Sequence, residues 1–182
     1  MICRNRAFLV CSVAALLGVT GCASALPVKR QEYAASRTER VLEAEWMDVL
    51  RAVDSTLRLQ RVVKRTPDTE DVLELRRADE RTWETGWIES QSRDKYVEYQ
   101  LDGIPKRKNL GVRLKYRVVA AKALGGVSLK VRQWEELEKL NSRGMSLGYD
   151  EVTSVDTSRS AELLEKVQQA LLAAPPSADL GR

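Results

Sequence analysis

The chain has 182 residues, with 30 Lys and Arg against 26 Asp and Glu, a formal net charge of +4. It contains no histidine, which removes the commonest general base, the commonest transition-metal ligand and the usual pH switch. A Ser-His-Asp triad is therefore excluded. The charge is dispersed and nearly compensated, whereas nucleic-acid binding depends on clustered Lys and Arg, so we expect no nucleic-acid partner.

The N-terminal segment has the three regions of a secretory signal. Arg4 and Arg6 give it a positive start, residues 7–19 are almost wholly apolar, and the small residues Thr20 and Gly21 follow. A membrane-spanning helix needs about 20 apolar residues, so the apolar segment is too short to span a bilayer. It is typical instead of the apolar region of a signal peptide that is cleaved after small residues.

The run Val19-Thr20-Gly21-Cys22 resembles the lipobox of bacterial prolipoproteins. The resemblance implies cleavage between Gly21 and Cys22 and leaves Cys22 triacylated at the new N-terminus. Each buried CH₂ contributes about 0.8 kcal/mol, and more than one acyl chain makes membrane attachment stable. The alternatives are a plain secretory signal with a chance cysteine, or a short buried helix.

The resemblance also bears on location and on the remaining thiols. The residue after Cys22 is Ala23 and not Asp, which is similar to lipoproteins delivered to the outer membrane. We therefore expect a lipid-anchored domain on the periplasmic face of the outer membrane. Cys3 and Cys11 would leave with the signal. Because lipid consumes Cys22, the mature domain would have no disulfide. We expect a signal peptide at 1–21, a lipidated tether at 22–35, one domain at 36–174 and a disordered tail at 175–182.

The domain is expected to begin with an amphipathic helix. Ser36 and Glu39 have the spacing of a capping box, in which each side chain satisfies a backbone N–H of the first turn. Apolar residues then recur at three- and four-residue intervals, as on one face of a helix. These residues are Leu42, Trp46, Val49, Leu50, Val53 and Leu57.

The middle of the chain changes to a strand period. Residues 58–65 are expected to form a strand that ends at the turn Pro67-Asp68, and residues 71–81 fit neither period cleanly, so they are left as a possible short strand. Two further strands are predicted at 83–90 and 95–101. In the first of these, Trp83, Thr85 and Trp87 would share one face.

The clearest pattern is a hairpin. Apolar residues alternate with charged or polar ones over 112–118 and again over 127–131, and Gly125-Gly126 between the two runs suits a tight turn.

The chain closes with another amphipathic helix. Thr157 or Ser158 can cap it, Glu162 lies in its first turn, and Ala173-Ala174-Pro175-Pro176 ends it. Its apolar stripe is expected to contain Leu163, Leu164, Val167, Leu171 and Leu172.

Together these elements predict an α+β fold, with a curled antiparallel sheet of four to six strands flanked by an N-terminal and a C-terminal helix. This order resembles the helix-grip domains of the BamC lipoproteins, accessories of the outer-membrane β-barrel assembly machinery. The match lies in the lipobox at Cys22, the helix from Ser36 and the closing helix. The chain departs from the family in having room for one domain and a short linker.

Few residues suggest catalysis. The pairs Glu135-Glu136 and Asp150-Glu151 could serve as acid and base or hold a hard cation, but carboxylates mostly lie on the solvated surface. Gly125-Gly126 lacks the Lys-Ser/Thr of a phosphate-binding loop. We therefore expect no enzyme, no cofactor and no metal site.

Two features suggest binding instead. Lys106, Arg107 and Lys108 follow Gly103 and Pro105 in an expected loop, where they could touch anionic headgroups or an acidic partner. The simpler interpretation is a solvated loop tip. Trp83 and Trp87 would form an interaction patch if they are exposed, and part of the core if they are buried.

The sequence thus favours a non-catalytic, membrane-anchored envelope lipoprotein that binds another envelope protein as an assembly accessory of the outer membrane. The alternative is a carrier of an apolar ligand in a cavity between sheet and helix. An enzyme that uses carboxylates alone is the third hypothesis.

Overall fold

A computed structural model describes residues 25–32, 35–153 and 155–173. The predicted signal peptide, the predicted lipidation site Cys22 and the predicted tail lie outside the described residues. The elements are β1 (Lys29–Arg30), β2 (Glu39–Leu42), α1 (Trp46–Leu57), β3 (Val62–Thr66), α2 (Val72–Arg77), β4 (Glu80–Thr85), β5 (Ile88–Leu101), β6 (Ile104–Ala123), β7 (Gly126–Leu140), β8 (Ser146–Glu151) and α3 (Ser158–Ala173).

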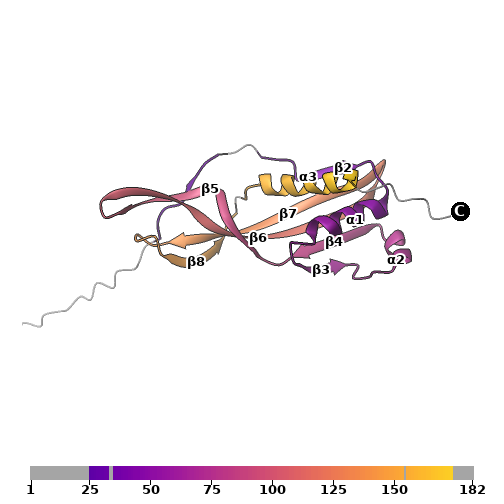
Figure 1. Cartoon of the computed structure of the whole chain (residues 1–182), viewed down its shortest axis with the longest axis horizontal. Coiled ribbons are helices and arrows are strands. Elements are labelled where there is room, and N and C mark those ends of the chain that lie inside the picture. Colours follow the sequence, from indigo (N-terminus) through magenta and orange to yellow (C-terminus); the bar gives the residue numbers. More distant parts are fainter. Residues whose placement is uncertain (1–24, 33–34, 154, 174–182) are drawn as a thin grey trace, which may run out of the picture.

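The strands form one curled antiparallel sheet, so the fold is α+β as predicted (Figure 1). The long strand β6 lies at its centre, with β5 and β4 following one another along one edge and β7 along the other. β7 also pairs with β2 and β8, β4 with β3, and β5 with β1. The described part of the chain contains eight strands rather than four to six, because three short strands carry too few residues to show a period.

The predicted hairpin of β6 and β7 is confirmed. Its strands pair from Val112 with Leu137 to Ala123 with Gly126. Gly125 and Gly126 have φ values of 83° and 148°, in the region that favours glycine. A Cβ on Gly126 would overlap the carbonyl oxygen of Leu42, so this glycine also lets the end of β2 approach the turn.

The helices α1 and α3 lie side by side over one face of the sheet (Figure 1). The alternating residues of β6 and β7 meet the apolar stripes of both helices, which confirms the stripe predicted for α1. The buried core includes Trp46, Val49, Leu50, Val53, Leu57, Trp83, Val112, Leu114, Val118, Leu129, Val131, Leu163, Leu164 and Val167.

The capping box at Ser36 is wrong. The backbone N–H of Ser36 donates to Thr157 Oγ1 at 2.9 Å, and residues 39–42 form β2, which pairs with β7. The helix begins only at Trp46, after Glu45. Leu42 is buried as expected, but from a strand, because pairing with β7 satisfies the backbone that the predicted first turn would have used.

The segment between α1 and β5 also differs from the prediction. The strand expected at 58–65 is β3, four residues later, and residues 71–81 contain the helix α2 instead of a strand. Asp71 caps α2 by accepting from the N–H groups of Leu73 and Glu74. The strand expected at 83–90 ends at Thr85, and Ile88–Leu101 forms one strand in place of the separate strand expected at 95–101.

The closing helix is confirmed as α3, with one correction to its stripe. Leu163, Leu164 and Val167 are buried and Leu171 packs partly against the core, whereas Leu172 is exposed. Asp156 accepts from the N–H of Ser158 at 2.9 Å, next to the predicted cap.

The segment expected to be a tether is docked where the structure describes it. Ala25 forms a bridge with Asn141, and the N–H of Leu26 donates to Leu140 O at 2.8 Å. Lys29 and Arg30 form β1 against β5, and the N–H of Gln31 donates to Asp94 O at 2.7 Å. Backbone pairing with two strands therefore fixes this segment, a tertiary contact that its local composition does not reveal.

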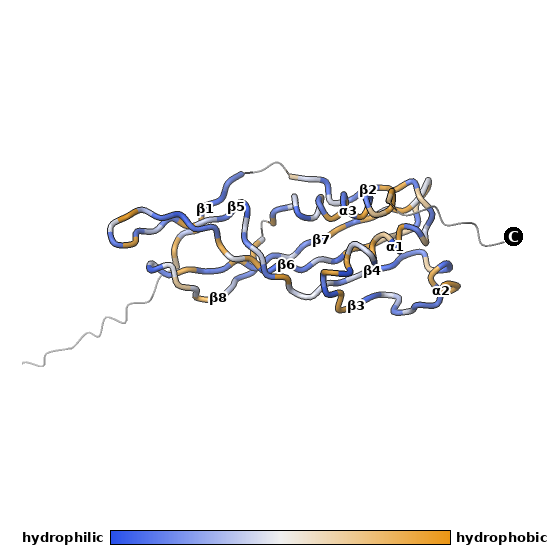
Figure 2. Tube along the Cα trace, viewed as in Figure 1, coloured by the Kyte–Doolittle hydropathy of each residue, from blue (hydrophilic) through white to orange (hydrophobic). Residues whose placement is uncertain are grey.

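The molecule is elongated (Figure 1). At one end the helices cover the sheet, and at the other a hairpin of β5 and β6 extends beyond the helices; we call residues 96–109 the arm. Apolar segments occur at the tip of the arm and at the start of β3 (Figure 2). Among the described residues, no helix is long and apolar enough to cross a membrane.

Candidate interaction surfaces and the polar network between them

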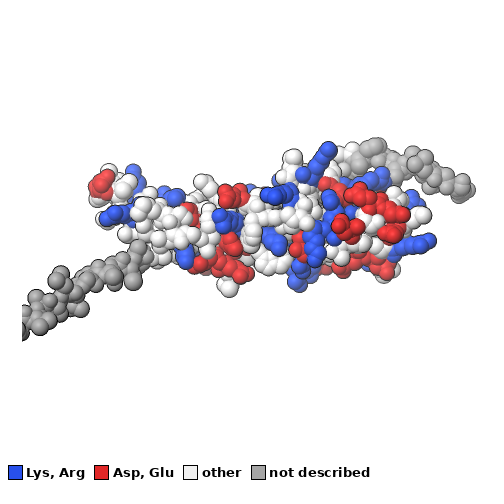
Figure 3. Space-filling model, turned by 90° about the horizontal axis from the view of Figure 1, so that it is seen from below, with Lys and Arg blue, Asp and Glu red and all other residues white. Residues whose placement is uncertain are grey.

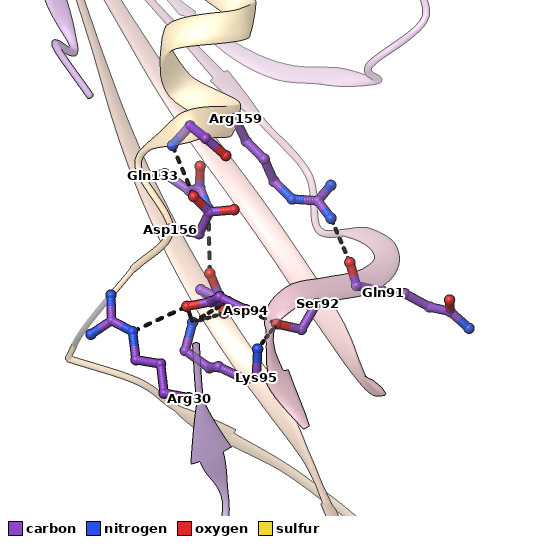
Figure 4. A network of polar contacts seen from close by, with 10 residues as sticks. Arg30, Gln91, Ser92, Asp94, Lys95, Gln133, Asp156 and Arg159 are labelled. Atoms are coloured by element: carbon purple, nitrogen blue, oxygen red, sulfur yellow. Dashed lines mark hydrogen bonds and ion pairs between the residues drawn. The ribbon is translucent and has the colours of Figure 1, made fainter. Parts of the chain in front are cut away.

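A buried polar network lies where the arm joins the helix-covered end. The pairing of β5 with β6 shifts register between Gln91 and Tyr96, and this irregularity turns Ser92, Asp94 and Lys95 into the interior. Bulges of this kind re-aim side chains. Figure 4 shows the network, with α3 above it and β1 below.

Four charges balance in the network. Lys95 Nζ lies 2.8 Å from Glu135 Oε1 and 3.1 Å from both carboxylate oxygens of Asp94, and Arg30 Nε donates to Asp94 at 3.1 Å. Burial alone would raise the pKa of Asp94, but the hydrogen bonds from Lys95 and Ser92 outweigh it and leave that pKa below its ordinary value. The network is therefore held as ion pairs, and it connects β1, β5 and β7.

A small pocket lies beside the network, between α3 and the start of β5. Its volume is about 210 Å³, and Leu114, Tyr116 and Leu163 form its apolar part. Arg93 at its rim pairs with Glu162, which lowers the pKa of Glu162, while Arg159 donates to Ser90 at 3.1 Å. Burial raises the pKa of Tyr116 to about 12, so the phenol stays neutral and is not a base at neutral pH.

The two tryptophans proposed for binding differ in exposure. Trp83 is fully buried in β4, where its Nε1 donates to Asp54 at 2.8 Å and Arg81 lies 5.3 Å from its ring, so it belongs to the core. Trp87 follows the end of β4 and is 47% exposed. The shared face predicted for Trp83, Thr85 and Trp87 is wrong for Trp87, because the strand ends before it.

Trp87 belongs to an apolar surface at the edge of the sheet. A register shift between Val62 and Lys64 places Val63 in a bulge of β3, where it is 57% exposed, and Leu59 before it is 96% exposed. A Cβ added to Gly86 would lie 3.3 Å from Val63 Cγ1, so the two residues are in close contact, and the Gly86 N–H donates to Arg61 O. We call Leu59, Val63 and Trp87 the β3-edge patch.

The strand beside this patch has an open edge. β3 pairs with β4 on one side and is the last strand of its path through the sheet, within the described residues (Figure 1). An unpaired strand edge presents backbone donors and acceptors that another chain can use, and exposed apolar patches are a common feature of protein interaction sites.

The basic residues of the predicted loop lie in a strand instead. Lys106, Arg107 and Lys108 are part of β6 in the arm, opposite Tyr99, Glu98 and Val97. Lys106 and Arg107 are exposed. Arg107 stacks 3.7 Å from the centroid of the Tyr96 ring, and Lys108 Nζ lies 3.9 Å from Glu138. The loop is only a turn, with Asp102 and Gly103 at positive φ.

The structure brings the two carboxylate pairs only partly together. Glu136 of β7 lies opposite Glu151 of β8. Glu135 is instead buried against Lys95, and Asp150 is exposed on β8 and pairs with Lys139 at 2.9 Å. Within the described ranges, no group of three or more His, Cys, Asp or Glu side chains could hold a metal ion.

Sequence reasoning missed the β3-edge patch and the polar network. Asp94 lies between the strands expected at 83–90 and 95–101, and Lys95 is the first residue of the second, so no local pattern shows that both are buried. Leu59 and Val63 lie in the strand expected at 58–65, but Leu59 precedes β3, and the bulge leaves Val63 exposed. No model of a known protein family matches the chain, and no curated protein sequence matches it significantly.

Proposed function

We propose that this protein is a non-catalytic lipoprotein, anchored through Cys22 to the periplasmic face of the outer membrane, that binds another envelope protein as an assembly accessory. The lipobox supports the anchor. The open edge of β3, flanked by the exposed β3-edge patch, is the observation that carries the binding function.

The edge favours one mode of recognition. An extended segment of the partner would add to β3 as a further strand, with main-chain hydrogen bonds giving affinity and side-chain contacts giving specificity. Tryptophan is enriched among the residues that dominate binding energy, and Trp87 stands at this edge with half of its surface exposed. Leu59 and Val63 extend the apolar contact.

The same observations weigh against the carrier alternative. Core side chains fill the contact of α1 with the sheet. One pocket beside α3 has about 210 Å³ with Arg93, Arg159, Glu162 and Lys166 in its lining, and a second has about 290 Å³ with Arg132, Gln133, Thr157 and Ser160 in its lining. Sites for apolar ligands usually have about 300–1,000 Å³ and mostly apolar walls. A helix-grip relationship to the BamC lipoproteins stays part of the proposal, supported by two helices over one face of a curled sheet.

The anchor is tested by Cys22→Ala in the full-length chain. We expect the variant to be unprocessed or released from the membrane fraction, whereas the wild type co-sediments with outer membranes. Mass spectrometry of the wild type should show an acylated N-terminal cysteine. A Cys22→Ala protein that stays with the membrane at unchanged size and yield would contradict the anchor.

Partner binding is tested by affinity capture of the lipidated protein after mild detergent extraction. The variant Val63→Asp/Trp87→Ser should lose most of a stoichiometric envelope partner, because a buried unpaired charge and a lost aromatic anchor each weaken an interface. Leu124→Ser is the matched control, since Leu124 is fully exposed at the β6–β7 turn. Equal partner recovery by both variants would refute the β3 edge as the binding surface.

A further inference from the structure

The position of Ala25 fixes where an anchored chain would meet its bilayer. Ala25 bridges to Asn141 at the end of β7, and Leu26 is bonded to Leu140. Cys22 precedes Ala25 by three residues, and three residues of extended chain span at most about 11 Å. A lipid on Cys22 therefore holds the β7–β8 turn close to the membrane surface.

The tip of the arm lies at the same end of the molecule. A Cβ added to Gly144 in the β7–β8 turn would lie 3.3 Å from the ring of Tyr99, so the turn and the arm are in close contact. The arm tip, this turn and the start of the described chain all lie at the end away from α1 and α2 (Figure 1). The anchor point and the arm thus face the same surroundings.

This end carries exposed apolar side chains. Leu101 and Ile104 flank the turn of the arm and are 46% and 55% exposed, and Met145 in the β7–β8 turn is 54% exposed. Exposed apolar residues at one end of a molecule mark a contact with a partner or a membrane. Tyr96 and Tyr99 lie in the same arm, and tyrosines are enriched at the level of lipid headgroups.

Basic side chains accompany the apolar ones. Lys106 and Arg107 in the arm and Arg143 in the β7–β8 turn are exposed. The arm end visible in Figure 3 is mostly uncharged or basic, with an acidic spot at its tip, while larger acidic areas lie further along the molecule. Basic residues near a bilayer are attracted to its anionic lipids.

We propose that this end of the molecule is a membrane-docking surface: Leu101, Ile104 and Met145 enter the headgroup region, and Lys106, Arg107 and Arg143 bind anionic headgroups. The inference rests on the proposed lipid anchor and deepens it, since the anchor would act together with a second contact. A bilayer is favoured over a protein as the occupant because the short chain to Cys22 brings the bilayer to this end.

The test uses the full lipidated protein in vesicles of phosphatidylethanolamine and phosphatidylglycerol that carry a spin-labelled quencher lipid. Single cysteines are introduced as Leu101→Cys, Ile104→Cys and Met145→Cys and coupled to a fluorophore. Leu124→Cys, fully exposed beyond the opposite end of β6, is the control. Residues that enter the interface lie about 5–10 Å deep, so the quencher should suppress their fluorescence several-fold more than that of the control.

A second comparison tests the charges. Lys106→Gln/Arg107→Gln/Arg143→Gln should weaken quenching at position 101 in vesicles with phosphatidylglycerol and leave it unchanged in phosphatidylcholine vesicles. Lys122→Gln, an exposed lysine near the β6–β7 turn, is the matched control and should have no effect. Equal behaviour of the triple variant and the control would overturn the role of the three basic residues.

The outcomes separate the inference from the proposed function. If the protein carries acyl chains and stays on the vesicles, but positions 101, 104 and 145 are quenched no more than position 124, the docking surface is refuted and the anchor stands. If those positions instead cross-link to a protein in native envelopes, a protein occupies this end, and the membrane-docking surface is refuted. If no acyl chain is present, both proposals fall.

Discussion

At the scale of single residues, the ion pairs around Lys95 form a charged network within a mostly apolar interior. Lys95, Asp94 and Glu135 are each less than 5% exposed, and burying an isolated charge in protein is costly. The network is tolerable because Arg30 supplies the second positive charge and Ser92 donates a further hydrogen bond to Asp94. Removal of any one charge leaves an uncompensated partner.

We predict that Lys95→Met destabilises the protein by about 3–5 kcal/mol, because it leaves two carboxylates buried beside an apolar side chain. Lys139→Met is the matched control, since Lys139 pairs with Asp150 on the surface, where an ion pair contributes about 0–1 kcal/mol. Urea unfolding monitored by tryptophan fluorescence measures both. A cost for Lys95→Met no larger than for Lys139→Met would contradict the prediction.

The lowered pKa of Asp94 makes stability depend on pH in one direction. Its ionised form is favoured in the folded state, so its contribution is fully present above the ordinary carboxyl pKa of about 4 and is lost as the pH falls through the lower folded pKa. We expect the free energy of unfolding to fall more steeply below about pH 4 in the wild type than in Asp94→Asn. Asp102→Asn, at the exposed arm turn, should keep the wild-type slope in urea unfolding at several pH values.

At the scale of elements, the sequence pattern predicted correctly those helices and strands for which local preference and tertiary contacts favour the same structure. The β6–β7 hairpin follows from strict alternation and two glycines, and α3 from its stripe. The start of α1 could not be predicted, because Leu42 continues the helical spacing of Trp46 and Val49 while its backbone pairs with β7. Tertiary pairing overrode local preference.

The same limit applies to the candidate sites. The sequence identified Trp83 and Trp87 as candidates but could not show which of them is exposed. The end of β4 at Thr85 decides this, because Trp87 lies beyond the strand. Leu59 and Val63 could not be identified from sequence, since only the bulge in β3 shows that Val63 faces outward. The partner of Lys95 lies forty residues away on β7, and no spacing rule connects them.

The β6–β7 turn provides a prediction at this scale. Gly126→Ala should destabilise the protein by a few kcal/mol, because its Cβ would collide with the backbone of Leu42 and its φ is positive. Gly125→Ala meets no atom within 4 Å and should cost only about 1 kcal/mol for its positive φ. Thermal unfolding measures the difference, which reports the packing of β2 on the turn; equal losses would refute that packing.

At the scale of the whole molecule, the two ends differ in how they are supported. Around Val118 and Ala120, β6 is buried beneath helices, whereas around Lys106 it is exposed in a two-stranded arm. Isolated hairpins are marginally stable, and regions with few buried contacts open locally at low free-energy cost.

Trypsin should therefore cut the folded protein first at Lys106, Arg107 or Lys108, while Lys130 in β7 stays protected. Mass spectrometry of early digestion products checks this order, since exposed, weakly supported segments are nicked first. Binding to vesicles of phosphatidylglycerol should slow cleavage in the arm if it docks on lipid. Early cleavage at Lys130 instead would show that the helix-covered end is the weaker one.

The docking of residues 25–32 on the sheet also sets a length. In a chain held at Cys22, Ala25 follows the lipid-bearing residue by three positions, so at most about 11 Å of extended chain would join the sheet to the lipid. Detaching both β1 and the contacts of Ala25 and Leu26 would release residues 25–32, eight residues or about 26 Å of extended chain at about 3.3 Å each. If the chain is anchored at Cys22 as proposed, the strength of the ion pair between Arg30 and Asp94 would help to set how far the domain can move from the membrane.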